Sequence, residues 1–255
     1  MSDGIDHQSL PFVSSVEWHA LLGSTNDRAR ELARTSAALP ALVVADRQTA
    51  GRGRGANRWW ASAGALTFSL LINPERHGIV PSRQGLLAIA TGLAVIDAVR
   101  ETTGLSARLK WPNDVLLDGK KLAGVLIEAV GPERWIVGVG ANVENRLGAA
   151  PPEIRARAVT LAEAPGAGKA AVLESCLTAF GRRIAQIASG DPELIGFARS
   201  RCALTGVQVK VVDGNRTIAG ECHGLAEDGA LLLYADGATT AMTAGSVERL
   251  DQPSA

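Results

Sequence analysis

The chain is organised around the stretch Gln48-Thr-Ala-Gly-Arg-Gly-Arg-Gly-Ala-Asn-Arg-Trp-Trp60. Its three glycines make it a poor helix and a poor strand, and each one leaves no Cβ between the backbone and a ligand. Successive N–H groups in such a segment form a concavity that binds anions. Arg52 and Arg54 add positive charge with a forked geometry that matches a phosphate or a carboxylate. The stretch therefore predicts a ligand-binding loop, in which Trp59 and Trp60 cover an apolar or aromatic ligand.

Two strand-like apolar runs, Ala41–Ala45 and Leu66–Ile72, flank this loop. The alternative interpretation of a Gly/Arg run is a solvated basic linker or a patch that binds nucleic acid. The position of the run between two strands favours the ligand-binding interpretation, because other polar clusters also occur at predicted strand ends.

Composition sets limits on the class of protein. The length of 255 residues suits a main domain with an appendage. Lys and Arg number 26 and so do Asp and Glu, so the whole protein has no net charge to attract nucleic acid or an anionic membrane. No apolar run reaches the roughly 20 residues of a membrane span, and the N-terminus lacks a signal-peptide pattern, so we expect a cytoplasmic protein. Cys176, Cys202 and Cys222 form no C-x-x-C pair and predict free, buried thiols.

The N-terminal part predicts a tail followed by a helix. Residues 1 to about 14 are polar and unpatterned, which is typical of a flexible tail. In the helix predicted over Leu21–Ala33, Ser24 is a candidate N-cap and Asp27 stands where a capping-box acid would. Thr25 and Asn26 add a hydroxyl and an amide at the same helix end. Capping alone and capping combined with ligand contact both remain open for this cluster.

The middle of the chain predicts a core helix and a hairpin. A 3.6-residue apolar period indicates a long helix from Pro81 to about Thr103. The turn pair Asp118-Gly119 between two apolar runs is a strong signal for an antiparallel hairpin.

Polar side chains gather at the ends of this hairpin. Asn113 and Asp114 precede its first strand, with Lys110 just upstream. Lys121 enters the apolar second strand, where Gly124 leaves room for a ligand to lie against the backbone. The hairpin is therefore a second candidate part of a binding site.

A third strand is predicted over Trp135–Asn142. Glycine weakens a strand interior, so Gly138 and Gly140 suggest the close approach of a ligand or of a neighbouring backbone.

The C-terminal part predicts a long loop, two helices and a small β module. Residues 144 to 168 indicate a loop without regular structure. Helices are predicted over 169–189 and 191–202. Short strands follow from Val207 onward, separated by Asp-Gly turns, which predicts a five-stranded barrel attached to an α+β domain.

Together, these clusters resemble the biotin protein ligase family, whose members attach biotin to a lysine of a carrier protein. The resemblance extends over about residues 20 to 250. It rests on five motifs that occur in the family's order, namely Ser24-Thr-Asn26, Gln48 with Gly51-Arg-Gly-Arg-Gly55 and Trp59, Lys110-Trp-Pro-Asn-Asp114, Lys121-Leu-Ala-Gly124 and Gly138-Val-Gly-Ala-Asn142.

The resemblance implies an α+β fold. Its catalytic domain, expected over residues 15–203, is a mixed β-sheet flanked by helices, of the class II synthetase-like type. A small SH3-like β-barrel is expected over residues 204–255. The resemblance also implies two half-reactions in one pocket, in which biotin and ATP first give biotinyl-5′-AMP and pyrophosphate, and biotin then passes to the carrier lysine. Mg²⁺ is the implied cofactor that shields the phosphates.

The resemblance also assigns roles to residues. Lys121 is the implied catalytic cation, and Arg54 keeps the mixed anhydride from escaping before a carrier arrives. The implied biotin-binding residues are Ser24, Thr25, Asn26, Gln48, Gly51, Arg52, Gly53, Trp59, Lys121 and Gly124. The implied residues for ATP or the adenylate are Arg52, Arg54, Lys110, Asn113, Asp114, Lys121 and Asn142, with Asp114 as the candidate ligand of Mg²⁺.

Several alternatives stay open. Asn113 and Asp114 also fit a turn after Pro112, and Asn142 also fits a strand-end cap. A lipoate or octanoate ligase or transferase has the same architecture, although the Gly/Arg loop and the C-terminal module favour biotin, because a ureido ring needs convergent hydrogen-bonding groups. A nonenzymatic module that binds nucleic acid through the basic loop is an alternative of another class.

The expected partners are biotin, ATP and an apo biotin carboxyl carrier protein. The resemblance leaves both a monomer and a homodimer formed through a sheet edge open. Fewer than about 25 residues precede the Ser24 cluster, which leaves no room for the winged-helix domain of some biotin ligases, so we expect no operator binding. The zero net charge and the lack of a long apolar run lead us to expect no nucleic-acid or membrane partner. Ala158–Leu161 offers none of the aromatic residues that often cover the adenine in the family.

Overall fold

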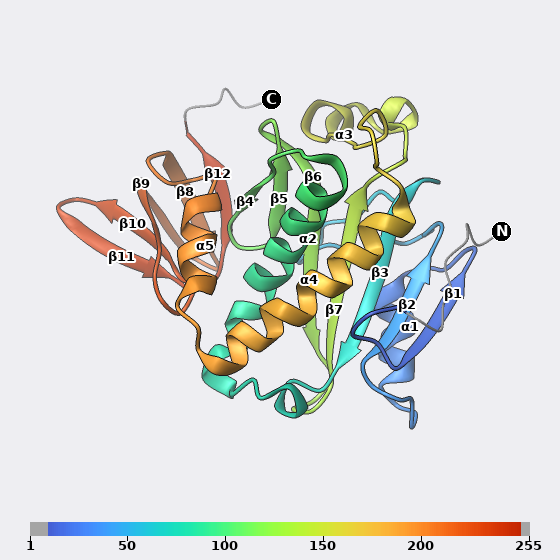
Figure 1. Cartoon of the computed structure of the whole chain (residues 1–255). Helices are drawn as coiled ribbons and strands as arrows, with labels where there is room; N and C mark the ends of the chain where they lie inside the picture. Colours follow the sequence, from blue (N-terminus) through green and yellow to red (C-terminus); the bar gives the residue numbers. More distant parts are fainter. Residues whose placement is uncertain (1–9, 251–255) are drawn as a thin grey trace.

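The computed structural model describes residues 10–250 (Figure 1). The main sheet has seven strands in the order β1-β2-β3-β7-β6-β5-β4. The first pair, β1 and β2, is parallel, and the other neighbouring pairs are antiparallel. The strands are β1 (Ser15–His19), β2 (Ala41–Ala45), β3 (Ala65–Ile72), β4 (Arg108–Lys110), β5 (Asp114–Leu117), β6 (Lys120–Ala129) and β7 (Trp135–Asn142). The predicted mixed sheet is confirmed, and so are the hairpin and the strand that ends at Asn142.

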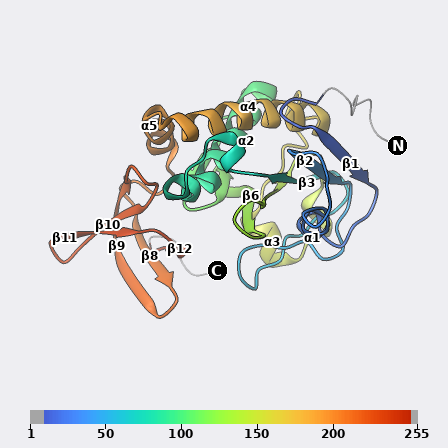
Figure 2. The same ribbon diagram turned by 90° about the horizontal axis from the view of Figure 1, so that it is seen from below.

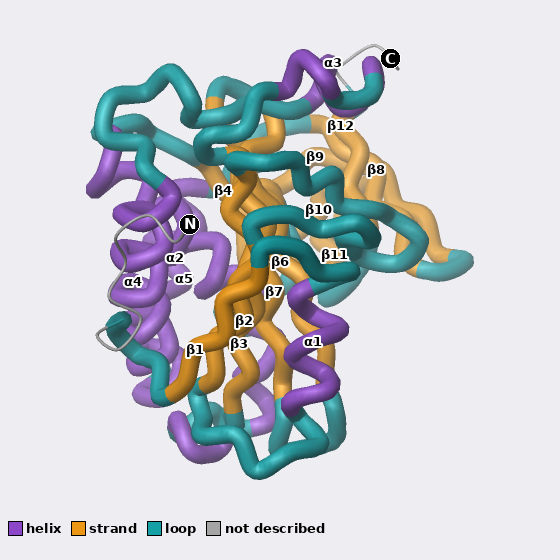
Figure 3. The backbone as a smooth tube through the Cα atoms, turned by 90° about the vertical axis from the view of Figure 1, so that its right-hand side faces the viewer, coloured by secondary structure: helices purple, strands orange, loops and turns teal. Residues whose placement is uncertain are grey.

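Helices cover both faces of this sheet (Figure 3). The helices α2 (Leu87–Thr103) and α4 (Lys169–Ser189) pack on one face, and α1 (Thr25–Leu32) packs on the other. Since successive side chains of a strand point to opposite faces, Leu42 and Val44 of β2 join the larger core while Ala41 and Val43 join the smaller one under α1. This two-sided burial explains why β2 and β3 read as continuous apolar runs.

The C-terminal strands form a second sheet, in the order β11-β10-β9-β8-β12 (Figure 2). They are β8 (Gln208–Asp213), β9 (Arg216–Leu225), β10 (Leu231–Ala235), β11 (Ala238–Met242) and β12 (Ser246–Arg249), and α5 (Glu193–Arg201) precedes them. The predicted five-stranded SH3-like module is confirmed, although its barrel is not closed. Within residues 10–250, the edge strands β11 and β12 share no hydrogen-bonded ladder, so the sheet stays open.

Backbone and indole groups hold the second sheet against the first domain. The N–H of Ala203 donates to the carbonyl of Leu109 at 2.8 Å, next to the edge strand β4. The indole Nε1 of Trp111, a buried residue, donates to the carbonyl of Gly229 at 2.9 Å. The segment 110–114 therefore belongs to the contact between the two sheets as well as to the predicted site.

We expect the substitution Trp111→Phe to lower the free energy of unfolding by about 1–2 kcal/mol, because it leaves the carbonyl of Gly229 without its buried donor. Denaturant unfolding followed by circular dichroism measures this change. An unchanged midpoint would show that this indole bond contributes nothing to the docking of the second sheet.

Three local predictions need correction. Of the predicted tail over residues 1–14, residues 1–9 lie outside the described residues. Its last part is packed rather than free, because Leu10 is buried and Phe12 contacts Phe180 edge-on, with ring centroids 5.1 Å apart. The predicted loop 144–168 contains a 3₁₀ turn, η3 (Leu147–Ala149), and a short helix, α3 (Pro152–Arg157). The predicted core helix begins as a 3₁₀ segment, η2 (Pro81–Leu86), and another short one, η1 (Glu75–His77), precedes it.

Two further predictions concern cysteines and membrane spans. Cys176, Cys202 and Cys222 are free and buried, as predicted. Among the described residues, no helix is both long enough and apolar enough to cross a membrane.

Candidate functional site

A pocket of about 620 Å³ lies on the face of the main sheet that carries α1. It collects side chains from the start of α1, the Gly/Arg loop, the segment 110–114, β6, β7 and β12. The predicted site residues that line it are Ser24, Thr25, Asn26, Gln48, Arg52, Gly53, Arg54, Trp59, Lys110, Asn113, Asp114, Lys121 and Gly124. Groups that lie far apart in the sequence therefore meet in one cavity.

Gly51 and Asn142 are the predicted site residues that do not line this pocket. The carbonyl of Gly51 accepts a hydrogen bond from the N–H of Trp59 at 3.0 Å, which closes the base of the loop. The buried amide of Asn142 donates to the carbonyl of Val159 at 3.0 Å and accepts from Asn145 at 3.0 Å. These are the contacts of a strand-end cap, the alternative weighed for Asn142.

The start of α1 is not capped as predicted. The side chain of Ser24 makes no capping hydrogen bond. Instead, the carbonyl oxygen of the Gln48 side chain accepts from the N–H of Thr25 at 2.7 Å. Asp27 is no capping-box acid either, because its carboxylate pairs with Arg30 and Arg52. Gln48 therefore joins the Gly/Arg loop to the helix end, and Ser24 lines the pocket.

Two of the predicted cations, Arg52 and Lys121, form ion pairs. Arg52 binds Asp27 at 2.5 Å and the carboxylate of Glu128 at 2.6 Å. Nζ of Lys121 lies 2.6 Å from Oδ1 of Asp114. The same Nζ also lies 5.9 Å from the centroid of the Trp59 ring, within reach of a cation–π contact.

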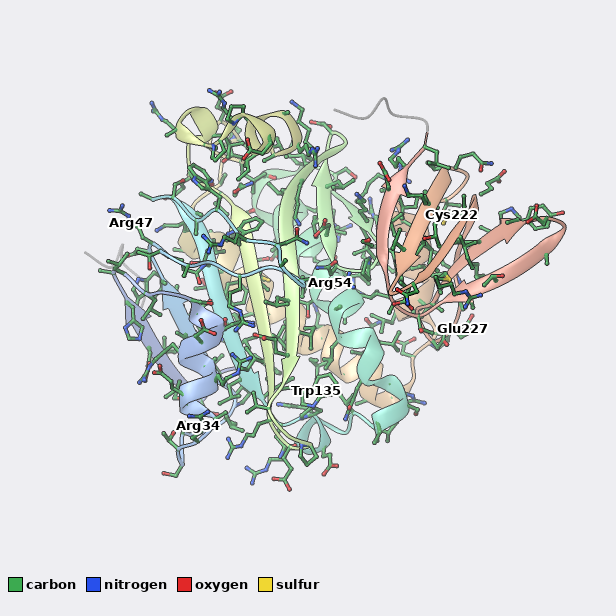
Figure 4. All side chains as sticks on the ribbon, turned by 180° about the vertical axis from the view of Figure 1, so that it is seen from behind. Arg34, Arg47, Arg54, Trp135, Cys222 and Glu227 are labelled. Atoms are coloured by element: carbon green, nitrogen blue, oxygen red, sulfur yellow. The ribbon has the colours of Figure 1, made fainter. Side chains whose placement is uncertain are left out.

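Arg54 joins three parts of the molecule. Its Nη1 donates to Oδ1 of Asn113 at 3.3 Å and to the carbonyl of Gly245 at 3.1 Å. Figure 4 shows Arg54 between the main sheet and the C-terminal sheet. The guanidinium therefore links the Gly/Arg loop to the segment 110–114 and to the second sheet.

Positive charge is concentrated around Lys110. Burial lowers the pKa of Lys110, Asp114 partly opposes that shift, and Lys121, Arg249 and Arg157 lower the pKa further. A site in which a lysine pKa falls in this way favours an anionic ligand, since such a ligand offsets the mutual repulsion of the cations.

The strand glycines make room for side chains of the protein itself. A Cβ at Gly138 would fall on the amide of Asn26, and one at Gly140 would fall within the indole of Trp59. A Cβ at Gly124 would lie 3.2 Å from Nζ of Lys121. Side chains, and not a neighbouring backbone, therefore lie against the glycines of β7. Both glycines line the pocket, and the close approach of a ligand to them stays a prediction.

We expect Gly140→Ala to weaken the binding of the small-molecule ligand by about 10-fold, because the new methyl displaces the indole of Trp59 from the pocket wall. Titration calorimetry with biotin, the ligand that the family resemblance implies, measures this effect. Gly148→Ala, at a position with open space around its Cβ, is the matched control. Equal affinities in the two variants would contradict the role given to Gly140.

Sequence reasoning missed the contribution of the second sheet. Ser246 and Val247 of β12 line the pocket, and Gly245 accepts the hydrogen bond from Arg54 across a separation of 191 residues. No local pattern signals this, because the contribution depends on how the two sheets are placed relative to each other.

Comparison with known proteins agrees with this arrangement. The model of the biotin/lipoate A/B protein ligase family matches residues 18–142. The chain is 34% identical over 240 residues to the biotin--[acetyl-CoA-carboxylase] ligase of Mycobacterium tuberculosis, covering 91% of this chain and 87% of that protein. It is 33% identical over 224 residues to the bifunctional ligase/repressor BirA of Bacillus subtilis, covering 85% of this chain and 68% of that protein.

A solved structure shows the same fold. The biotin protein ligase of Aquifex aeolicus in complex with biotin and ATP superposes with a TM-score of 0.82 at 32% identity, over 92% of this chain and 99% of that one. The resemblance found in the sequence is thus confirmed, and the chain belongs to the biotin/lipoate A/B protein ligase family.

Proposed function

We propose that this protein is a biotin protein ligase, which activates biotin with ATP to biotinyl-5′-AMP and transfers biotin to a lysine of a biotin carboxyl carrier protein. The observation that carries this proposal is the shared pocket, in which polar groups at the start of α1 face a cluster of cations from the loop, the hairpin and the segment 110–114. The similarity to ligases of the same name and to the Aquifex complex with biotin and ATP supports it.

The first half-reaction joins two anions. A carboxylate oxygen of biotin attacks the α-phosphorus of ATP, the new P–O bond forms, and the bond to the leaving pyrophosphate breaks. Because the two reactants repel each other, the site must supply localised positive charge where they meet. In this proposal Lys121 contacts the biotin carboxylate and the α-phosphate, while Arg52, Arg54 and Lys110 bind phosphate oxygens.

The second half-reaction forms an amide. The neutral amine of the carrier lysine attacks the acyl carbon of the adenylate, and AMP leaves as the mixed anhydride breaks. A free lysine is mostly protonated at neutral pH, since its pKa is about 10.4, so the amine must lose a proton before it attacks. Arg54 keeps the adenylate in place until that lysine arrives.

Mg²⁺ would bind in this site together with the phosphates of ATP. Among the described residues, no group of three or more His, Cys, Asp or Glu side chains is placed to hold a metal ion. Mg²⁺ is usually held by one or two carboxylates together with substrate phosphates, and in this proposal Asp114, with Asn113 beside it on the pocket wall, would be that carboxylate. The bound ion would supply charge neutralisation of the triphosphate.

Pyrophosphate release tests the proposal. The protein incubated with ATP and biotin should release pyrophosphate, and it should biotinylate an apo biotin carboxyl carrier protein when the carrier is added. Octanoate is the control substrate, because a lipoate- or octanoate-specific site needs a longer apolar tunnel instead of convergent polar groups. Release with octanoate but not with biotin would overturn the proposal.

A further inference from the structure

The polar cluster at the base of the pocket contains a buried hydroxyl that sequence reasoning did not single out. Ser69 of β3 is fully buried, and its Oγ lies 2.7 Å from Oδ1 of Asn26 and 2.8 Å from Oγ1 of Thr25. On the other side, Nδ2 of Asn26 donates to Oε2 of Glu128 at 2.7 Å. These contacts form one chain from Glu128 through Asn26 and Ser69 to Thr25.

Glu128 fixes the direction of this chain. Burial raises the pKa of Glu128, but the hydrogen bonds from Asn26 and Arg30 and the charges of Arg52 and Arg30 outweigh burial, so the pKa stays below its usual value. An ionised carboxylate accepts hydrogen bonds and donates none. The Asn26 amide must therefore turn its NH₂ group toward Glu128 and its carbonyl oxygen toward Ser69.

The directions of the hydroxyl protons of Ser69 and Thr25 follow from the number of protons that each group carries. A serine hydroxyl has one proton, and a carbonyl oxygen has none to give, so Ser69 donates to Asn26. Ser69 can then only accept from its other neighbour, which means that Thr25 donates its hydroxyl proton to Ser69. This leaves Oγ1 of Thr25, on the pocket wall, with lone pairs and no proton to offer a ligand.

Gln48 is oriented by the same kind of argument. The backbone N–H of Thr25 can only donate, so Gln48 must present its carbonyl oxygen to it. Its NH₂ group then points away from the helix end, toward the Gly/Arg loop, where Nε2 would lie 3.4 Å from a Cβ at Gly51. Thr25 and Gln48 both line the pocket, so we take Thr25 as its acceptor and the NH₂ group of Gln48 as its donor.

We propose that Glu128, Asn26 and Ser69 are positioning residues that make Thr25 an obligate hydrogen-bond acceptor for an N–H group of a cyclic urea. This inference rests on the proposed function, since it concerns how the biotin ring is told apart from acyl chains. A urea has both N–H donors and a carbonyl acceptor, so it matches the pair formed by Thr25 and Gln48. A lipoyl or fatty chain offers Thr25 no such donor. The chain of hydrogen bonds from Glu128 through Asn26 and Ser69 to Thr25, which we call the relay, would therefore not strengthen the binding of such a chain.

The test combines protein and ligand substitutions. Calorimetry should compare biotin with two cyclic carbamate analogues, each with one ring N–H replaced by oxygen, in the wild-type protein and in Ser69→Ala. The wild-type protein should bind at least one carbamate about 10-fold more weakly than biotin. Ser69→Ala should bind biotin about 10-fold more weakly, because Thr25 is then free to turn its proton toward the ligand, and it should bind that carbamate with nearly wild-type affinity.

Thr67→Ala is the matched control. It removes a buried hydroxyl two residues away on the same strand, which donates to the carbonyl of Ala45 and lies outside the relay. This variant should keep the wild-type preference for biotin over the carbamate. Retained affinity of Ser69→Ala for the carbamate also shows that this variant is folded.

The outcomes distinguish a failure of the proposed function from a failure of the relay alone. If the wild-type protein binds no biotin, the proposed function itself fails. If it binds biotin but Ser69→Ala binds biotin as tightly as Thr67→Ala does, only the relay is overturned. An equal loss of affinity for biotin and for both carbamates in Ser69→Ala would overturn it as well, because the effect would then not act on an N–H group.

Discussion

Replacing Lys121 with alanine is expected to slow adenylate formation by on the order of 10²-fold or more while leaving the fold intact. The size of the effect follows from the loss of a preorganised cation at the place where, in the proposed reaction, two anions meet. Lys121 is suited to that place because its Nζ lies between Asp114 and the ring of Trp59 on the pocket wall, at the start of β6. Single-turnover pyrophosphate release with saturating biotin and ATP measures the rate.

The fold should survive this substitution because the ion pair that it removes is partly exposed to solvent. The side chain of Lys121 is 38% exposed, and pairs of this kind contribute about 0–1 kcal/mol to stability. The control is Lys120→Ala, which removes the adjacent, exposed lysine at the first position of β6, outside the pocket. A wild-type rate in Lys121→Ala, with both variants folded by circular dichroism, would remove Lys121 from the mechanism.

Local patterns predicted the elements of the main domain because local physics decides them. The turn at Asp118-Gly119 has positive φ at both residues, 51° and 76°, and a two-residue hairpin of this type favours the Asp-Gly pair. The apolar period of α4 matches the helix observed over Lys169–Ser189. The short strands β1 and β4 were missed, since neither carries enough alternating residues to stand out from the adjacent loops.

The part of the site that sequence reasoning could not reach depends on tertiary placement. Ser69 and Thr67 are ordinary residues in an apolar strand, and only the packing of α1 on β3 shows that one joins the polar relay and the other does not. Ser24 has the right residue type for an N-cap, but Gln48, distant in the sequence, serves the helix end instead. Whether a polar group bonds a neighbour in the sequence or a distant residue depends on distances in the folded structure, which a single sequence does not contain.

The open edge of the SH3-like module has a related cause. Five short strands with Asp-Gly turns specify an antiparallel sheet, since each turn fixes the pairing of its two neighbours. Closure would require pairing between the first and last strands of the spatial order, β11 and β12, which no turn dictates. What β12 does instead is line the pocket, through Ser246 and Val247.

The hydrogen bond from Arg54 to the carbonyl of Gly245, just before β12, makes Arg54 important for retaining the adenylate in the proposed mechanism. We expect Arg54→Gly to release the acyl adenylate about 10- to 10²-fold faster and to spread biotin onto lysines of bystander proteins. A hydrogen bond made by a charged group contributes about 1.5–3 kcal/mol, and each 1.4 kcal/mol is a factor of ten. Because both bonds of Arg54 come from the same donor atom, Nη1, we count them as one such bond. The substitution removes the bonds to Asn113 and to the carbonyl of Gly245, so the loop loses its links to the segment 110–114 and to the second sheet.

Two further variants show which property of Arg54 matters. Arg54→Ala removes the guanidinium without adding the backbone freedom of glycine, so it should release the adenylate nearly as fast as Arg54→Gly if the hydrogen bonds are responsible. Arg47→Gly makes the same exchange at an exposed position outside the pocket, and it should keep the adenylate as the wild type does. Adenylate release is measured by rapid filtration, and labelling by incubation with a protein that is not a carrier. If labelling stays confined to the carrier in Arg54→Gly, another group retains the adenylate, and the contact with Gly245 serves only to join the two sheets.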